Sequence, residues 1–438
     1  MVQIKIDFDK EMGKIKPMHA VNNGPHLPVR MFSKNGNFED FKALDIPYVR
    51  NHDAAFRANY GGEHTVDINA IFPNFDADPY DPASYDFVCT DHYCKTIMDA
   101  GSQVFYRLGN KIDHRVKKYD SVPPKDFNKW AVICEHIIKH YNEGWADGFH
   151  WNITYWEIGN EPENRPECWD GPFEDFLVLF EITAKHLKEK FPYIKVGGPA
   201  FATKGATRLT EIFLTYMKER NVPLDFFSWH LYRSETKIYK ELIYKIREQL
   251  DTCGYPDAEN ILDEWTYMIN WHEGCRESKK IIISTKGAAF FSAVMAVGQH
   301  SPLDMLMYYD AAIGSTLNGL FYFYTEEKLK GYYPYMMFSK LYKLGSHVAS
   351  ETDCDDIYAV VAKNDTQSAM MITYFTNDAE AKSKKIELLL DNCPAKAYNL
   401  FLLDDEHDAD NIGTLGTTTN RVCFNVEPNT VVLLESTE

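Results

Sequence analysis

Two glutamates follow short apolar runs that are typical of β-strands. Glu161 comes directly after "ITYWEIGN" (153–160), and Glu264 lies near the end of "NILDEW" (260–265). A carboxylate at the end of such a run is costly unless it is paired or used. Two carboxylates in one pocket can hydrolyse a glycoside: one protonates the departing oxygen, and the other attacks the anomeric carbon or activates water. Glu161 and Glu264 are therefore the candidate catalytic pair.

The elements that must position these residues form an alternating pattern of strands and helices. We predict strands over 15–22, 46–52, 102–109, 153–160, 194–200, 224–232, 260–265 and 304–310. Helical periodicity is clear over 127–142, 173–187 and 240–250. Parallel strands joined by helices close readily into a (β/α)8 TIM barrel, so we predict an α/β fold with this barrel over residues 14–345. In such a barrel the carboxyl ends of all strands open onto one face, where Glu161 and Glu264 would meet.

The remaining segments have a different character. Short alternating strands separated by Asn, Asp and Gly turns fill residues 346–438, which predicts an antiparallel β-sandwich. The stretch "VQIKIDF" (2–8) alternates in the same way. We therefore expect residues 1–13 to form an amino-terminal strand that joins the sandwich.

The two glutamate motifs together resemble a known family. "WEIGNEP", followed later by "ILDEW", is similar to the retaining glycoside hydrolases of clan A, and most closely to family 39, which contains β-xylosidases and α-L-iduronidases. The resemblance implies that Glu161 is the acid/base, with Asn160 beside it to bind the sugar 2-hydroxyl. It implies that Glu264 is the nucleophile.

Further residues take their roles from the same resemblance. Arg50 is expected to hold the nucleophile, Tyr232 to donate a hydrogen bond to it, and His52 and His230 to bind sugar hydroxyls. The tryptophans that could stack on a sugar face are Trp156, Trp229, Trp265 and Trp271, and we assign Trp265 to substrate binding. Where many clan members have a Trp after the eighth strand, this chain has Tyr308, Tyr309 and Asp310, whose role the sequence leaves open. Glu157 is expected to form an ion pair inside the barrel.

We therefore predict a retaining, exo-acting β-glycosidase that hydrolyses short oligosaccharides or glycosides by double displacement, with β-xylosidase as the leading activity. Two alternatives stay open at this point. The sugar could be a β-glucoside, an α-L-arabinoside or a uronide. The chain could also be a sugar-binding barrel without catalytic activity.

Composition limits the partners that we expect. The formal net charge is −18 and the pI is near 5.3, so nucleic acid would be repelled. The first residues lack the apolar core of a signal peptide, and no apolar run is long enough to span a membrane. With nine cysteines in no regular framework, we expect a cytoplasmic protein. The family resemblance is compatible with a homo-oligomer, and it implies no cofactor.

Two motifs resemble metal sites. Cys89, His92 and Cys94 lie in "CTDHYC", but this segment looks helical, which would scatter their side chains around the axis. His136 and His140 share a helical face, but the glutamate precedes the first histidine, unlike the zinc-protease motif. We therefore expect no metal at either place, and we expect the two histidines to lie on a solvated edge.

Overall fold

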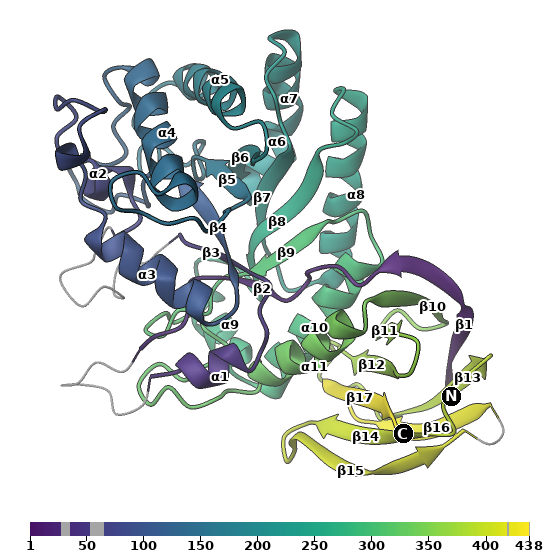
Figure 1. Ribbon diagram of the computed structural model, residues 1–438. Helices are drawn as coiled ribbons and strands as arrows, with labels where there is room; N and C mark the ends of the chain where they lie inside the picture. Colours follow the sequence, from purple (N-terminus) through teal and green to yellow (C-terminus); the bar gives the residue numbers. More distant parts are fainter. Residues whose placement is uncertain (28–35, 53–64, 418–419, 438) are drawn as a thin grey trace.

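A closed barrel of eight parallel strands forms the larger part of the molecule (Figure 1). The computed structural model describes residues 1–27, 36–52, 65–417 and 420–437. The barrel strands are β2 (Ala20–Asn22), β3 (Tyr48–Arg50), β4 (Gln103–Leu108), β5 (Tyr155–Ile158), β6 (Lys195–Phe201), β7 (Phe226–Tyr232), β8 (Glu259–Thr266) and β9 (Met305–Tyr308). Each of the eight predicted strand segments overlaps one of them, and the predicted TIM barrel is confirmed.

The lower part of the barrel interior is filled with apolar side chains. These residues are Ala20, Phe105, Tyr155, Phe226, Ile261, Met305 and Met307. They come from alternate positions of several strands, as the pleat requires. The packed interior leaves only the carboxyl ends of the strands available for chemistry.

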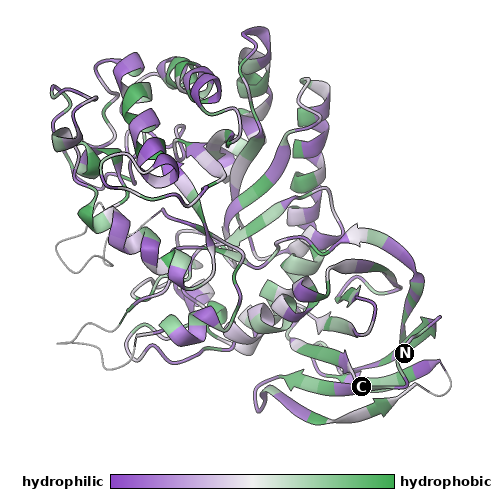
Figure 2. Cartoon of the chain, viewed as in Figure 1, coloured by the Kyte–Doolittle hydropathy of each residue, from purple (hydrophilic) through white to green (hydrophobic). Residues whose placement is uncertain are grey.

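Helices cover the outside of the barrel (Figure 1). They are α1 (Phe38–Lys42), α2 (Ile68–Ile71), α3 (Val88–Asp99), α4 (Phe127–Glu143), α5 (Phe173–Lys190), α6 (Thr203–Arg208), α7 (Thr210–Glu219), α8 (Thr236–Thr252), α9 (Cys275–Ile282), α10 (Thr285–Gln299) and α11 (Tyr332–Leu344), with a 3-10 turn at Pro82–Ser84. Helix α4 begins where Asp126 accepts hydrogen bonds from two backbone amides, and it ends at Gly144, whose φ of 76° is left-handed. Helices such as α4 and α5 carry both hydrophilic and hydrophobic residues (Figure 2), as amphipathic helices must when one face covers a barrel.

The second unit is a nine-stranded sheet with the order β15-β14-β17-β12-β11-β10-β1-β13-β16. Its strands are β1 (Val2–Lys14), β10 (Ser346–Thr352), β11 (Ile357–Lys363), β12 (Ser368–Tyr374), β13 (Lys384–Asp391), β14 (Ala397–Leu403), β15 (Asp408–Gly416), β16 (Arg421–Val426) and β17 (Thr430–Ser436). Strands from both ends of the sheet share one core, so the sheet curls into a sandwich-like shape. The expectation that the amino-terminal strand joins this unit is confirmed: β1 pairs antiparallel with β10 and parallel with β13.

Helices α10 and α11 connect the two units. Both pack against β11 and β12, and α10 is buried over nearly its whole length. Among the described residues, no single helix is long and apolar enough to cross a membrane, although α9 and α10, bent by 84°, pass that test of length and composition as a pair. Burial of α10 between barrel and sheet accounts for its apolar composition.

Candidate active site

Glu161 stands just beyond the carboxyl end of β5. The chain turns sharply there, with a φ of 87° at Gly159 and 46° at Glu161, and the Glu161 amide donates to the carbonyl of Ala200 at 2.9 Å. This anchor directs the side chain across the barrel mouth. One carboxylate oxygen lies 2.8 Å from Nδ1 of His230, and the other accepts a hydrogen bond from Asn164 at 3.3 Å.

Glu264 comes from β8, where the strand carries an extra residue. In the pairing with β7, Leu262 lies opposite Trp229 and Glu264 lies opposite His230, so Asp263 has no partner and forms a β-bulge. The bulge brings Asp263 and Glu264 to the same inner side of the strand, since both lie close to Arg50. Tyr232 donates to one oxygen of Glu264 at 2.5 Å, and Arg50 donates to the other at 2.7 Å.

Arg50, at the end of β3, uses its whole guanidinium in this site. Its two terminal nitrogens donate to Glu264 and to Asn160, each at 2.7 Å, and its Nε donates to Glu157 at 2.7 Å. Burial disfavours the guanidinium charge, but the neighbouring carboxylates, that of Glu157 above all, outweigh burial and raise the pKa of Arg50. Arg50 is therefore permanently charged, and Glu157 forms the expected ion pair inside the barrel.

His52 lies beside Glu264, with 3.6 Å between its Nε2 and a carboxylate oxygen. Its Nδ1 accepts a hydrogen bond from Arg107 at 3.1 Å, and Arg107 in turn pairs with Asp67 at 2.6 Å. Burial, together with the charges of Arg50 and Arg107, lowers the pKa of His52 well below its usual value. The neutral ring therefore presents Nε2–H toward the site, where it can donate to a sugar hydroxyl.

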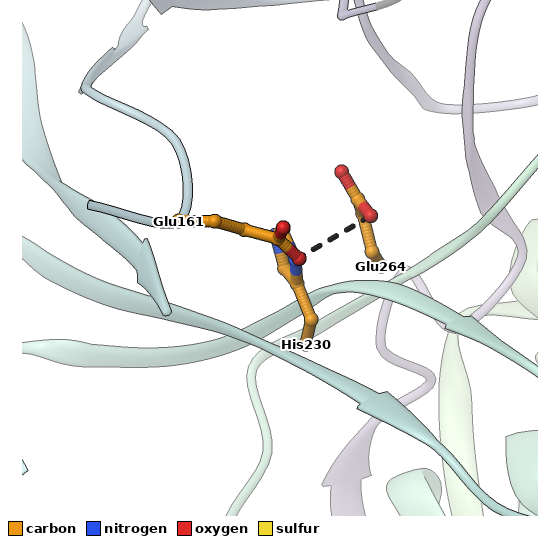
Figure 3. A group of neighbouring side chains, drawn as sticks. All are labelled: Glu161, His230 and Glu264. Carbon is orange, nitrogen blue, oxygen red and sulfur yellow. Dashed lines mark hydrogen bonds and ion pairs between the residues drawn. The ribbon is translucent and has the colours of Figure 1, made fainter. Parts of the chain in front are cut away.

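Glu161, His230 and Glu264 converge on one point (Figure 3). One ligand atom from each lies within 4.8 Å of the other two, a set that could also hold a metal ion. A cation there would have to share Glu264 with the guanidinium of Arg50, so a proton-transfer role fits this cluster better.

The pKa values of the two glutamates are shifted in opposite directions. Burial raises the pKa of Glu264, although His230 and Arg50 oppose this effect. Burial also raises the pKa of Glu161, but hydrogen bonds from His230 and Asn164 outweigh it and lower that pKa, provided that Nδ1 of His230 carries the proton. Which imidazole nitrogen is protonated therefore decides the state of Glu161.

The assignment of Trp265 to substrate binding is wrong. Its ring is fully buried on the outer side of β8, where it packs against Phe290 and Phe291 of α10. Trp156 and Trp229 are also fully buried. Trp271 differs, because it is 51% exposed and its ring lies 4.9 Å from that of Tyr232.

The structure shows where Tyr308, Tyr309 and Asp310, at the end of the eighth barrel strand, lie. Tyr308 is buried in the core against Trp265, and Asp310 accepts a hydrogen bond from the amide of Ala312. Tyr309 is half-buried, with its ring 6.3 Å from that of Tyr232. Tyr309 is therefore the member of this segment that lies beside the site.

The "CTDHYC" motif lies in helix α3, as expected. The expectation that His136 and His140 lie on a solvated edge is wrong. His136 and His140 lie buried under aromatic side chains, not on a solvated edge. Each Nδ1 lies within hydrogen-bonding distance of a backbone carbonyl, of Val132 and Trp145 respectively. In His140 the second ring nitrogen, Nε2, also lies 2.9 Å from Asp91.

Sequence reasoning missed two polar residues of the site. Asn22 accepts a hydrogen bond from Arg50 at 3.1 Å and donates to the backbone oxygen of Asp263 at 2.6 Å. Asp263 itself is fully buried beside Arg50. The signal for Asn22 was its place at the end of the first barrel strand, but the signal for Asp263 is a bulge that no residue pattern reveals.

Comparison with known proteins agrees with this geometry. The family model described as glycosyl hydrolases family 39 matches residues 3–254, more than half of the chain. A β-xylosidase from Geobacillus stearothermophilus is 32% identical over 157 residues, which cover 35% of this chain and 28% of that protein. The chain thus spans well under two thirds of the length of this curated relative.

Two solved structures share the fold over the full chain. A glucosidase from Croceicoccus marinus superposes with a TM-score of 0.81 at 19% identity, covering 100% of this chain and 99% of that one. A GH39 β-xylosidase from Caulobacter crescentus superposes with a TM-score of 0.73 at 17% identity, covering 100% of both chains. At these identities the likeness is one of fold, whereas the family model is matched by sequence. The chain belongs to the glycosyl hydrolases of family 39.

Proposed function

We propose that the protein is a retaining, exo-acting β-glycosidase, with Glu264 as nucleophile and Glu161 as acid/base. The separation of the two carboxylates carries this proposal. One carboxylate oxygen of each lies within 4.8 Å of one of the other. The carboxyl groups of retaining enzymes are about 5–5.5 Å apart, whereas an inverting enzyme needs about 6.5–9.5 Å to admit a water molecule. Such proximity supports direct attack by one carboxylate on the anomeric carbon.

The hydrogen bonds distinguish the two roles. Glu264 accepts from a guanidinium and a phenol, and both stabilise a carboxylate anion. Its negative charge in turn favours the proton on Glu161. In the first step Glu264 bonds to the anomeric carbon while Glu161 gives its proton to the leaving oxygen. In the second step Glu161 takes a proton from water, which displaces Glu264.

Burial and charge support a small, neutral sugar. The side chains of Glu161 and Glu264 are only 16% and 6% exposed, which favours entry of a single terminal residue. Arg50 and Arg107 are buried and already paired with carboxylates, so neither is available to a uronide. Because the matched relative from Geobacillus stearothermophilus is named a β-xylosidase, we propose a terminal β-xyloside as substrate. We also propose that the protein acts in the cytoplasm on short oligosaccharides.

A panel of nitrophenyl glycosides tests this function. The wild type should cleave the β-xyloside faster than the β-glucoside, α-L-arabinoside or β-glucuronide. Glu264→Ala should be inactive, and azide should rescue Glu161→Ala to give a glycosyl azide of retained configuration. Glu259→Ala, which removes a carboxylate from the opposite end of β8, is the matched control and should keep wild-type turnover.

The same panel can contradict the proposal. A product of inverted configuration would exclude the nucleophile role of Glu264. If the enzyme prefers another glycoside, the proposed mechanism stands and the proposed β-xyloside substrate is wrong. If no glycoside is cleaved and a 2-fluoro-xyloside fails to label Glu264, the chain is a sugar-binding barrel.

A further inference from the structure

Several polar atoms directly below the catalytic glutamates have no conventional partner. Among the residues that the structure describes, Glu157 Oε1, both oxygens of Asp263 and Nε2 of His230 are buried without a hydrogen bond of standard geometry. Arg50 Nε lies 2.7 Å from Glu157 Oε2 and 3.2 Å from Asp263 Oδ2, so one N–H faces two carboxyl groups. Unpaired buried polar atoms are costly, so this cluster requires an explanation.

A proton on Asp263, together with the hydroxyl group of Ser228 that also hydrogen-bonds Glu157, gives these atoms partners. Asp263 and Glu157 are both fully buried, and two adjacent carboxyl groups in such a place do not both ionise. Burial, followed by the charge of Glu157, raises the pKa of Asp263 well above its usual value. Burial disfavours the Glu157 anion too, but Arg50 and a hydrogen bond from Asp263 outweigh burial and lower the pKa of Glu157. Asp263 is therefore the donor of this pair, with its Oδ2 on the side of Arg50 and Glu157.

The other oxygen of Asp263 faces the imidazole. Asp263 Oδ1 lies 3.6 Å from Nε2 of His230, which a small rotation would bring to hydrogen-bonding distance. In a protonated carboxyl group that donates through Oδ2, Oδ1 can only accept. His230 must then carry its proton on Nε2, so its Nδ1 becomes an acceptor.

We propose that Asp263 is a positioning residue, protonated at neutral pH, that holds His230 in the Nε2–H form and thereby keeps the proton on Glu161. The 2.8 Å contact between Glu161 and Nδ1 is then a hydrogen bond donated by the carboxyl group. This inference rests on the proposed function, in which Glu161 is the acid. The opposite tautomer would donate from Nδ1 to Glu161 and to Glu264, whose Oε2 lies 3.4 Å away but already accepts from Tyr232.

Neither Asp263 nor His230 gains or loses a proton in this scheme. Glu161 alone gives its proton to the leaving oxygen and regains one from water. The charged or titratable groups that face Glu161 are His230, Glu163, Cys168, Tyr232, Glu264 and Arg50. Those that face Asp263 are Glu157, Arg50, His230 and Glu264. Asp263 acts on Glu161 through His230.

The tautomer can be measured without turnover. Nitrogen-15 NMR of the imidazole, assigned with His230→Gln, should show the proton of His230 on Nε2 in the wild type and in Asp263→Asn, since the amide reproduces both hydrogen bonds. Asp263→Ala should move that proton to Nδ1. A wild-type proton on Nδ1, or an Asp263→Asn spectrum like that of Asp263→Ala, would overturn the proposal even if the sugar assignment is correct.

Kinetics give a second, independent readout on whichever glycoside the panel identifies. Asp263→Ala should lower kcat/KM on the order of 100-fold for a poor leaving group but less than about threefold for dinitrophenol, because only the former needs the acid. The basic limb of its pH profile should move to lower pH, and Asp263→Asn should restore that limb. Equal losses of kcat/KM for both leaving groups would mean a purely structural role and would overturn the proposal.

Asp304→Ala, just before β9 at the other end of the barrel, is the matched control. If Asp263→Ala does not fold, the spectra of the wild type and of Asp263→Asn decide.

Discussion

The hydroxyl group of Tyr232 lies 2.5 Å from Oε2 of Glu264, and the same tyrosine ring lies against Trp271. One residue thus connects Glu264, the proposed nucleophile, to the exposed rim of the site. The hydrogen bond stabilises the carboxylate, and the ring contact places an aromatic surface at the entrance. These two effects can be separated by substitution.

Tyr232→Phe removes the hydroxyl group and keeps the ring. We expect kcat/KM to fall about 10- to 100-fold, because a hydrogen bond to a charged group contributes about 1.5–3 kcal/mol. Loss of the donor also raises the pKa of Glu264, so the acidic limb of the pH profile should move to higher pH. Measurement of kcat/KM across pH tests both effects. An unchanged acidic limb would show that Tyr232 does not stabilise the ionised nucleophile.

Arg50→Lys keeps the charge but loses the forked geometry that contacts Glu157, Asn160 and Glu264 together. We expect activity to fall by on the order of 1,000-fold and the free energy of unfolding to fall by about 3–5 kcal/mol, since buried carboxylates lose their partner. Chemical denaturation and initial rates measure the two effects. The control is Arg220→Lys on the exposed surface of the barrel, which should change neither. Arg50→Lys with normal activity would mean that a point charge suffices.

Two tryptophan substitutions should affect different properties, one the KM and the other the stability of the fold. Trp271→Ala removes a half-exposed ring beside Tyr232, so we expect KM to rise about tenfold with little change in stability. Trp265→Ala empties a buried site against α10, so we expect about 3–5 kcal/mol of destabilisation. Thermal unfolding and Michaelis–Menten kinetics on both variants provide the comparison. If Trp271→Ala lowers stability without changing KM, the role of Trp271 is to pack within the fold and not to bind substrate.

Glu163 should make stability depend on pH. Burial raises the pKa of this carboxyl group to about 8. Between the unfolded value of about 4.5 and the folded value of about 8, the folded state binds more protons, so stability should fall as pH rises through this range. Glu163→Gln removes the titration, and it should be more stable than the wild type by about 1–3 kcal/mol at pH 9 but not at pH 4. Chemical denaturation of both proteins at pH 4 and pH 9 measures the difference. An equal difference in stability between Glu163→Gln and the wild type at the two pH values would contradict this prediction.

Much of the barrel could be predicted because its strands are apolar runs bounded by turn residues. The pattern is weaker in two strands of the second unit: β15 is rich in Asp, Asn and Gly and is largely exposed at the sheet edge, and β10 is polar. The contacts of Arg50, Tyr232 and Glu264 followed from family resemblance and were found in the structure. Trp265 was misassigned although the sequence held the signal, since a residue next to an inward-facing glutamate points outward in a pleated strand.

The position of β1 has a consequence for biosynthesis. This strand lies in the interior of the nine-stranded sheet, with Ile4 opposite Thr352 on one side and Leu388 on the other. On the ribosome it must therefore wait for about 350 further residues before either neighbour exists, on the order of 20–70 s at about 5–20 residues per second. An alternating apolar strand without a partner for that time is a target for chaperones and for pairing with other nascent chains.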